Sequence, residues 1–265
     1  MLEKTMSEEI KSFSNQLIEA ERNRVGSKPL TELKPSITIH EAYHIQLKTI
    51  ARKVETGATI VGKKIGLTSI AMQELLGVDE PDYGHLLDEM AIENSGTVLK
   101  PQVLQPRVEG EIAFVLKEEL RGPNVTAEDV LKATDYVLPA LEIVDSRITD
   151  WKIKLQDTIA DNASSGLFVL GDRPVSIEDV NLKEVGMNFY RNGELMNTGK
   201  GSAALGDPAY CVAWLANKLH EFNLTLEPGE LILSGALSAA VYANPGDEFS
   251  AVFDGMGKVS CTFER

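Results

Sequence analysis

The sequence has few of the features that mark secreted or membrane proteins. It contains only two cysteines, Cys211 and Cys261, with no CxxC pair, which excludes a disulfide framework and favours a reducing compartment. No apolar run approaches the length of a membrane span, and the N-terminus lacks the basic and apolar regions of a signal peptide. We therefore expect a soluble cytoplasmic protein with no membrane partner.

Basic charge is also scarce. The chain has 26 lysines and arginines against 40 aspartates and glutamates, a formal net charge of -14. Nucleic-acid binding needs clustered basic residues, so a nucleic-acid partner is not expected. The same negative field would repel an anionic small molecule, and such a substrate would need a metal ion or a few local cations to attract it.

The common nucleotide-binding loops are absent, because neither a Walker loop nor a GxGxxG motif occurs, and no internal repeat is visible. What is present is a chain of 265 residues, 43% of them hydrophobic, which is enough for a sizeable core. Helical periodicity near the N-terminus is followed by mixed and then strand-rich segments. We predict an α+β fold with a helical N-terminal region, residues 1–60, and a larger domain, residues 61–265.

Local signals place several elements. Apolar residues at helical spacing predict helices from about residue 7 to 24 and from about 39 to 56, each after a Thr-x-x-Glu capping box, at Thr5 and Thr38. Asn-Gly at 192–193 predicts a β-hairpin, and Pro208 after Asp207 predicts a helix through about His220. A further short helix is expected over 69–76.

Carboxylates lie in two predicted strands at positions where a core strand should be apolar. Glu109 and Glu111, within the strand 107–116, must point to the same side with Cα atoms roughly 6 to 7 Å apart. Glu142 lies in an apolar run, 138–145, where an unpaired carboxylate would cost several kcal/mol. These three glutamates are a candidate metal site.

The ligand chemistry indicates the type of ion. Carboxylate oxygens without nearby cysteine or histidine favour Mg²⁺ or Mn²⁺, with open positions left for water and substrate. A Glu-x-Glu pair by itself is equally typical of two solvated glutamates at a strand edge. Glu142, inside its apolar run, shifts the balance toward a metal site.

Three further residues are candidates for proton transfer. Lys64 follows a predicted strand and lies beside Ile65, so partial burial would lower its pKa, although a surface lysine on an edge strand is the simpler interpretation. Asp82 and His85 lie in a segment, 77–86, that is rich in turn formers and acids and is predicted to be a loop. Either could act as an acid or base, or serve only the turn.

Two other features have a functional and an ordinary interpretation. His40 and His44 have the i,i+4 spacing of a metal pair, but without a third ligand nearby a solvated helix face is favoured. The polar segment 150–165 predicts a lid over a site or, equally, a surface connection.

Six short motifs occur in order along the chain: Gly62-x-Lys64-Ile65-Gly66-Leu67-Thr68, Pro81-Asp82-Tyr83-Gly84, Glu109-x-Glu111, Pro139-Ala140-Leu141-Glu142, Asp145-Ser146-Arg147 and Ala160-Asp161-Asn162-Ala163-Ser164. Together, from about residue 40 to the C-terminus, they resemble the 2-hydroxypenta-2,4-dienoate (2-oxopent-4-enoate) hydratases. The resemblance implies the fold of the fumarylacetoacetase superfamily, a mixed β-roll after a helical N-terminal part, with residues 61–265 as the catalytic domain.

The resemblance also implies an activity and its residues. It implies metal-dependent hydration of 2-hydroxypenta-2,4-dienoate to 4-hydroxy-2-oxopentanoate in the meta-cleavage degradation of aromatic compounds, by a homo-oligomer that can associate with a sister decarboxylase. By resemblance, the metal ligands are Glu109, Glu111 and Glu142, the acid/base residues are Lys64 and Asp82, and the substrate-binding residues are Leu67, Asp161, Asn162 and Ser164.

Two alternatives stay open. The sister 2-oxo-3-hexenedioate (4-oxalocrotonate) decarboxylases share the glutamates and the lysine but usually have an apolar residue at the position of Asp82, so Asp82 favours hydration. Against this, residues 235–241 partly resemble the decarboxylase form of that loop. The non-enzymatic alternative is an acidic metal-binding or assembly subunit.

Overall fold

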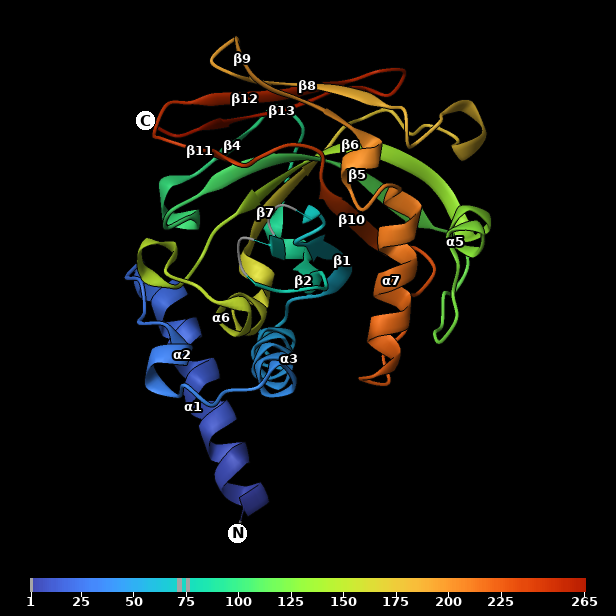
Figure 1. The fold of residues 1–265 in the computed structure, drawn as a ribbon. Helices are drawn as coiled ribbons and strands as arrows, with labels where there is room; N and C mark the ends of the chain where they lie inside the picture. The colour runs from blue at the N-terminus through green and yellow to red at the C-terminus, as the bar shows by residue number, and fades with distance from the viewer. Residues whose placement is uncertain (1, 71–72, 75–76) are drawn as a thin grey trace.

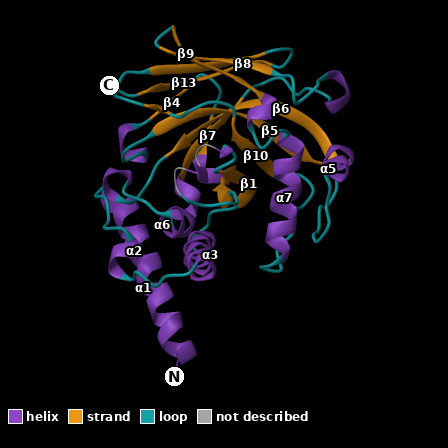
Figure 2. Ribbon diagram, viewed as in Figure 1, coloured by secondary structure: helices purple, strands orange, loops and turns teal. Residues whose placement is uncertain are grey.

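The computed structural model describes residues 2–70, 73–74 and 77–265. Figure 1 shows a five-stranded sheet lying over a larger, strongly curled sheet, with the N-terminal helices and α6 gathered on the side away from the smaller sheet. Figure 2 shows the same separation of strands from helices. The α-helices of the described residues are α1 (Leu2–Asn23), α2 (Leu30–Leu33), α3 (Ile39–Glu55), α5 (Ala127–Ala133), α6 (Leu155–Ala160) and α7 (Pro208–His220).

The larger sheet carries the candidate residues. Its strand order is β2-β1-β10-β5-β6-β7-β3, with β11 paired to β5 beside β10. Its strands are β1 (Ile60–Gly66), β2 (Asp82–Leu87), β3 (Ala91–Ile92), β5 (Arg107–Leu116), β6 (Thr134–Val144), β7 (Ser165–Leu170), β10 (Leu231–Ala236) and β11 (Val241–Tyr242).

The smaller sheet has the order β4-β13-β12-β8-β9. Its strands are β4 (Gly96–Val98), β8 (Gly186–Arg191), β9 (Glu194–Lys200), β12 (Glu248–Phe253) and β13 (Gly257–Phe263). The turn between β8 and β9 has positive φ at Asn192 and Gly193, 54° and 78°, which confirms the predicted Asn-Gly hairpin.

The two sheets pack closely where β5 crosses beneath the smaller sheet. A Cβ on Gly110 would lie 2.3 Å from Met187 Sδ, so a side chain here would force the Met187 side chain to move. Since side chains alternate along a strand, Glu109 and Glu111 point the other way, into the hollow of the larger sheet. Gly110 therefore packs in the core between the sheets, and the two glutamates lie on the opposite face of β5.

The helix predictions are largely confirmed. The Thr38 hydroxyl accepts from the Glu41 amide at 3.1 Å, and the Glu41 carboxylate accepts from the Thr38 amide at 2.8 Å, which is the predicted capping box. Helix α7 has the predicted bounds, with Asp207 as its N-cap. The predicted cap at Thr5 is wrong, because α1 begins at Leu2 and the good helix formers before Thr5 continue the helix.

Two further predictions are wrong. Residues 82–87 form strand β2 rather than a loop, because this buried segment pairs with β1 along its whole length. Within the segment 150–165, residues Leu155–Ala160 form α6, whose Leu155 and Ile159 are buried and which packs against α3, so this part is neither a lid nor a surface connection. The helix expected over 69–76 includes four residues, 71–72 and 75–76, outside the described part of the chain.

The remaining expectations concern surfaces. The His40 and His44 rings meet edge to face, with centroids 4.4 Å apart, and the His40 ring stacks on Phe222. In the described residues the two histidines belong to no group of three metal-ligating side chains. No helix within the described ranges combines the length and apolar character needed to cross a bilayer. The division between 1–60 and 61–265 stays a prediction.

Candidate active site

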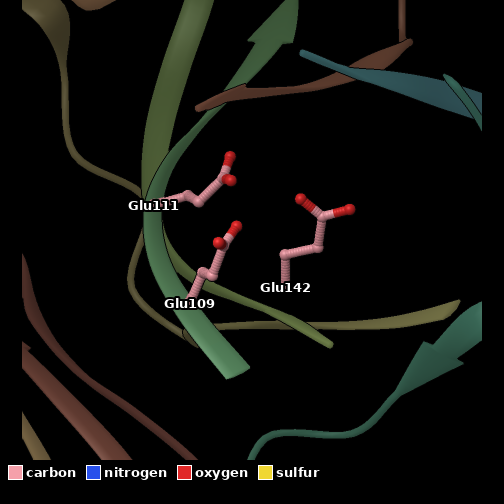
Figure 3. A group of neighbouring side chains, drawn as sticks. All are labelled: Glu109, Glu111 and Glu142. Carbon is pink, nitrogen blue, oxygen red and sulfur yellow. The ribbon is translucent and has the colours of Figure 1, made fainter. Parts of the chain in front are cut away.

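Three carboxylates converge in the hollow of the larger sheet. Glu109 and Glu111 leave β5 on one side, and Glu142 lies directly opposite Glu109 on the paired strand β6. One oxygen of each carboxylate lies within 4.8 Å of the others, and Figure 3 shows the three side chains pointing toward a common space. Glu111 and Glu142 are each only 1% exposed, whereas Glu109 is partly exposed. The group therefore opens toward solvent beside Glu109.

The protein only partly neutralises these carboxylates. Glu111 Oε2 accepts from the Gly235 amide at 2.8 Å, whereas Glu111 Oε1 and Glu142 Oε2 accept no hydrogen bond from the described residues. Burial and the neighbouring Glu142 raise the pKa of Glu111 well above its usual range, and burial, then Glu142, raises the pKa of Glu109 to about 7. A hard divalent cation fits these unpaired oxygens and would relieve their repulsion.

Lys64 and Asp82 lie beside the carboxylates. Lys64 Nζ forms an ion pair with Glu142 Oε1 at 3.0 Å and donates to the Ala163 carbonyl at 3.2 Å. Asp82 Oδ2 accepts a long bond from Thr158, 3.4 Å, whereas Asp82 Oδ1 has no hydrogen-bond partner among the described residues. The structure thus brings together both predicted acid/base residues and the three glutamates.

A glycine makes room for this pair. Gly66 lies opposite Asp82 in the β1–β2 pairing, and a Cβ at Gly66 would stand 2.2 Å from Asp82 Oδ1 and 3.4 Å from Lys64 Nζ. Any side chain at Gly66 would therefore force the Asp82 carboxylate out of its present position.

The expected lowering of the lysine pKa is wrong. Burial alone would lower the pKa of Lys64, but the Glu142 and Asp82 carboxylates outweigh it and raise that pKa above its ordinary value. Burial has the opposite effect on the aspartate and raises the pKa of Asp82 to about 6. A charged ammonium and a carboxyl with one free oxygen face the same space, which suits proton transfer.

A strained turn supports Lys64. Asn162, Ala163 and Ser164 have φ of 56°, 50° and 52°, a left-handed run that costs free energy at each non-glycine residue. Asn162 holds the turn to β2, because its Oδ1 accepts from the His85 amide at 2.7 Å and its Nδ2 donates to the His85 carbonyl at 2.9 Å. This turn presents the Ala163 carbonyl to Lys64.

A buried ion pair closes the other end of the turn. Arg147 Nε donates to Asp161 Oδ1 at 2.5 Å, and the Arg147 amide donates to Asp161 Oδ2 at 2.8 Å. The same guanidinium donates to the carbonyls of Asp145 and Ser165, both at 2.6 Å. Arg147 therefore ties the end of β6 to the start of β7.

Most polar groups of the expected substrate-binding residues form hydrogen bonds within the protein. Asp161 and Asn162 are fully engaged with protein partners, as described above, and the Ser164 hydroxyl lies 3.2 Å from the Thr158 hydroxyl. Leu67 is half-buried with a φ of 57°. Substrate contact by Leu67, Asp161, Asn162 and Ser164 stays a prediction.

His85 does not join the acid/base pair. It lies on the face of β2 opposite Asp82, opposite Lys63 in the β1–β2 pairing. Its Nδ1 is 3.1 Å from Gln46 Oε1, and since Gln46 Nε2 donates to the Tyr83 and Ile159 carbonyls, Nδ1 carries the proton. Its role is structural.

Sequence reasoning missed several groups around the site. Thr158, the Ala163 carbonyl and the Gly235 amide contact Asp82, Lys64 and Glu111, but two of them are backbone groups with no side-chain signal. Only Thr158 had a signal, its position in the polar segment before the Ala160–Ser164 motif.

Residues 74–264 match the family model described as fumarylacetoacetate (FAA) hydrolase C-terminal. The chain belongs to the fumarylacetoacetate hydrolase family. A solved structure in this family's fold is similar over nearly its whole length: 4-oxalocrotonate decarboxylase from Pseudomonas putida G7, complexed with magnesium and adipate, with TM-score 0.95, 37% identity, and coverage of 97% of this chain and 98% of that one. The predicted α+β fold is confirmed.

Curated relatives in the fumarylacetoacetate hydrolase family carry hydratase names. The chain is 51% identical to 2-hydroxypent-2,4-dienoate hydratase of Pseudomonas putida, covering 81% of this chain and 97% of the relative. It is 47% identical to 2-hydroxyhexa-2,4-dienoate hydratase of Comamonas testosteroni, covering 96% and 97%. The resemblance drawn from the six motifs is confirmed.

Proposed function

We propose that this protein is a hydro-lyase that hydrates 2-hydroxypenta-2,4-dienoate to 4-hydroxy-2-oxopentanoate in the meta-cleavage degradation of aromatic compounds. The observation that carries the proposal is Asp82, a buried carboxyl with one unpaired oxygen that faces Lys64 and the three glutamates. The hydratase names of the similar relatives support the same activity.

Glu109, Glu111 and Glu142 would hold the metal ion. The unpaired oxygens and the all-carboxylate donor set favour Mg²⁺ or Mn²⁺, and the similar decarboxylase structure is named as a magnesium complex. When bound, the ion would act as a Lewis acid that stabilises negative charge developing on the substrate's C2 oxygen.

Lys64 and Asp82 would divide the proton transfers. Hydration first requires a proton at C5 of the dienol and loss of the C2 hydroxyl proton, which conjugates the remaining double bond with the new C2 carbonyl. Water then adds at C4 and loses a proton, and C3 gains one, which gives the 4-hydroxy-2-oxoacid. Lys64 is the donor, because its ammonium is held charged between Glu142 and the Ala163 carbonyl. Asp82 is the base, because Oδ1 is free to accept a proton from water.

The decisive experiment follows two substrates in parallel by ultraviolet absorbance with purified protein and Mg²⁺. Loss of 2-hydroxypenta-2,4-dienoate with formation of 4-hydroxy-2-oxopentanoate is expected. Loss of CO₂ from 2-oxo-3-hexenedioate without hydration of the dienol would replace the hydratase with the decarboxylase alternative. Turnover of neither substrate would favour an assembly subunit.

A metal-ligand variant tests the ion itself. Glu109→Gln should weaken Mg²⁺ or Mn²⁺ binding, measured by calorimetry, by at least about tenfold. Replacing a residue that only supports a metal ligand already costs about tenfold in metal affinity, and Glu109 would be a ligand itself. Glu128→Gln is the matched control, since the Glu128 side chain is 77% exposed and its ion pair is with Lys132 on the same helix. Full activity of Glu109→Gln without metal would contradict the proposal.

The assembly is a further proposal. A homo-oligomer, and association with a sister decarboxylase, are predicted by the resemblance. Light scattering behind size-exclusion chromatography, on the protein alone and mixed with such a decarboxylase, tests both. A monomer under all conditions would contradict them.

A further inference from the structure

Arg107 lies at the open end of the carboxylate group. It precedes Glu109 by two residues on β5, so its side chain leaves the strand on the same side as Glu109 and Glu111. Glu109 is the partly exposed member of the group, which places Arg107 on the side from which solvent reaches the site. The side chain of Arg107 is itself half-buried.

Two aromatic rings hold the guanidinium in place. Its central carbon lies 4.3 Å from the Trp151 ring centroid and 4.2 Å from that of Tyr242. The guanidinium also donates to the Tyr242 hydroxyl, and Tyr242 lies opposite Arg107 in the β5–β11 pairing. Trp151 is fixed in turn, because its indole donates to the Gln105 carbonyl at 3.0 Å. The plane and position of the cation are therefore set before any ligand arrives.

Arg107 has no acidic partner in the described part of the chain. Its buried Nε lacks a hydrogen-bond partner, and the bond to Tyr242 is the side chain's only one to the described residues, so most of its five N–H donors stay unused. By contrast, the buried cations Lys63, Lys64 and Arg147 each have a carboxylate partner: Glu230, Glu142 and Asp161. In a chain of net charge -14, an unpaired arginine beside three glutamates calls for a functional explanation.

Stacking between rings does not supply that explanation. Cation–π contacts stabilise the guanidinium but satisfy none of its N–H groups, and a buried donor without a partner destabilises the protein. A carboxylate ligand would satisfy them, because the planar guanidinium matches its two oxygens. The positive charge of Arg107 would also attract an anionic substrate, which the net negative charge of the protein repels.

We propose that Arg107, held between Trp151 and Tyr242, binds the C1 carboxylate of the 2-oxoacid substrate and so determines the preference for anionic substrates. The inference rests on the proposed function, in which the same substrate reaches Glu109, Glu111 and Glu142. Arg107 acts in binding and orientation. Proton transfer stays with Lys64 and Asp82.

The test measures binding of oxalate, a small analogue of a 2-oxoacid, to the Mg²⁺-loaded protein by calorimetry. Arg107→Met should weaken oxalate binding by at least about tenfold, because at least one hydrogen bond between charged groups is lost. The Mg²⁺ affinity should change by less than about twofold. Arg107→Lys should fall between, because it keeps the charge and loses the planar fork. With the dienol substrate, KM should rise by a similar factor and kcat should change less.

Two controls keep the result interpretable. Arg121→Met removes the same charge from a side chain that is 66% exposed, and it should bind oxalate as the wild type does. Tyr242→Phe keeps the ring and removes the hydroxyl that positions the guanidinium. Oxalate binding should weaken by about threefold, because one hydrogen bond to Arg107 is lost. If Arg107→Met does not fold, Arg107→Lys and Tyr242→Phe decide the question.

Three outcomes separate the hypotheses. Equal oxalate affinity of wild type and Arg107→Met would refute the role of Arg107 and leave the proposed function standing. A parallel loss of Mg²⁺ and oxalate affinity also refutes it, because Arg107 would then act through Glu109. No oxalate binding by the Mg²⁺-loaded wild type would refute the proposed function together with this inference.

Discussion

Replacing Arg147 with methionine should destabilise the protein strongly and impair catalysis at a distance. The substitution keeps an apolar stem but leaves the Asp161 carboxylate, whose side chain is 1% exposed, without its charge partner. It also removes the donors to the Asp145 and Ser165 carbonyls. Breaking a buried ion pair from one side costs about 3–5 kcal/mol.

That cost converts into a measurable shift in melting temperature. Unfolding entropy of about 2.1 cal/mol/K per residue gives about 0.56 kcal/mol/K for 265 residues, so Arg147→Met should lower Tm by about 5 to 9 °C. Differential scanning calorimetry measures the shift. Arg121→Met is the matched control: its ion pair with Glu119 is exposed, worth about 1 kcal/mol or less, and Tm should fall by less than about 2 °C.

The same variant tests the link from Arg147 to the site. The pair with Asp161 anchors the left-handed turn that presents the Ala163 carbonyl to Lys64. We expect kcat to fall about ten- to a hundredfold at a temperature where the variant is folded, because small misplacements of reacting groups are costly. A Tm shift no larger than that of Arg121→Met would show that the buried pair is not the anchor.

Three further changes test the site and its surroundings. Asp82→Asn should lower kcat of hydration by about 10² to 10⁴, the usual contribution of a general base, with metal affinity unchanged; an unaltered rate would contradict its role. Gly66→Ala should abolish most activity, since its Cβ would stand 2.2 Å from Asp82 Oδ1; a fully active variant would show that this crowding is relieved without displacing Asp82. Burial, and then Lys63, lowers the pKa of His85 to about 3, so the unfolded chain binds a proton near pH 6.5 that the folded protein excludes. His85 therefore contributes stability above pH 6.5 that is lost as pH falls toward 3, about 2 kcal/mol by pH 5. Urea unfolding of His85→Asn, which keeps an amide donor for Gln46, should show a correspondingly flatter pH dependence, and curves of equal slope would refute the assignment.

Local patterns were sufficient wherever a property depends on neighbours in the chain. Two-residue alternation placed Glu109 and Glu111 on one side of β5, and the bounds of that strand agree with the prediction. Capping chemistry placed α3, and Pro208 after Asp207 placed α7. The burial of Glu142 followed from its apolar neighbours in β6. These signals are local because backbone periodicity and helix caps involve residues only a few positions apart.

Other properties depended on contacts that no local pattern encodes. The lysine pKa went up rather than down because pairing with β2 brings Asp82 to Lys64 and curling of the sheet brings Glu142 from the more distant β6. Helix α6 was buried against α3, and Arg107 was placed between rings from positions 151 and 242. The sequence by itself determined which side chains share a strand face, since that depends on backbone geometry. Only the tertiary structure decided which charges meet, because electrostatic interaction depends on distance in space and on burial.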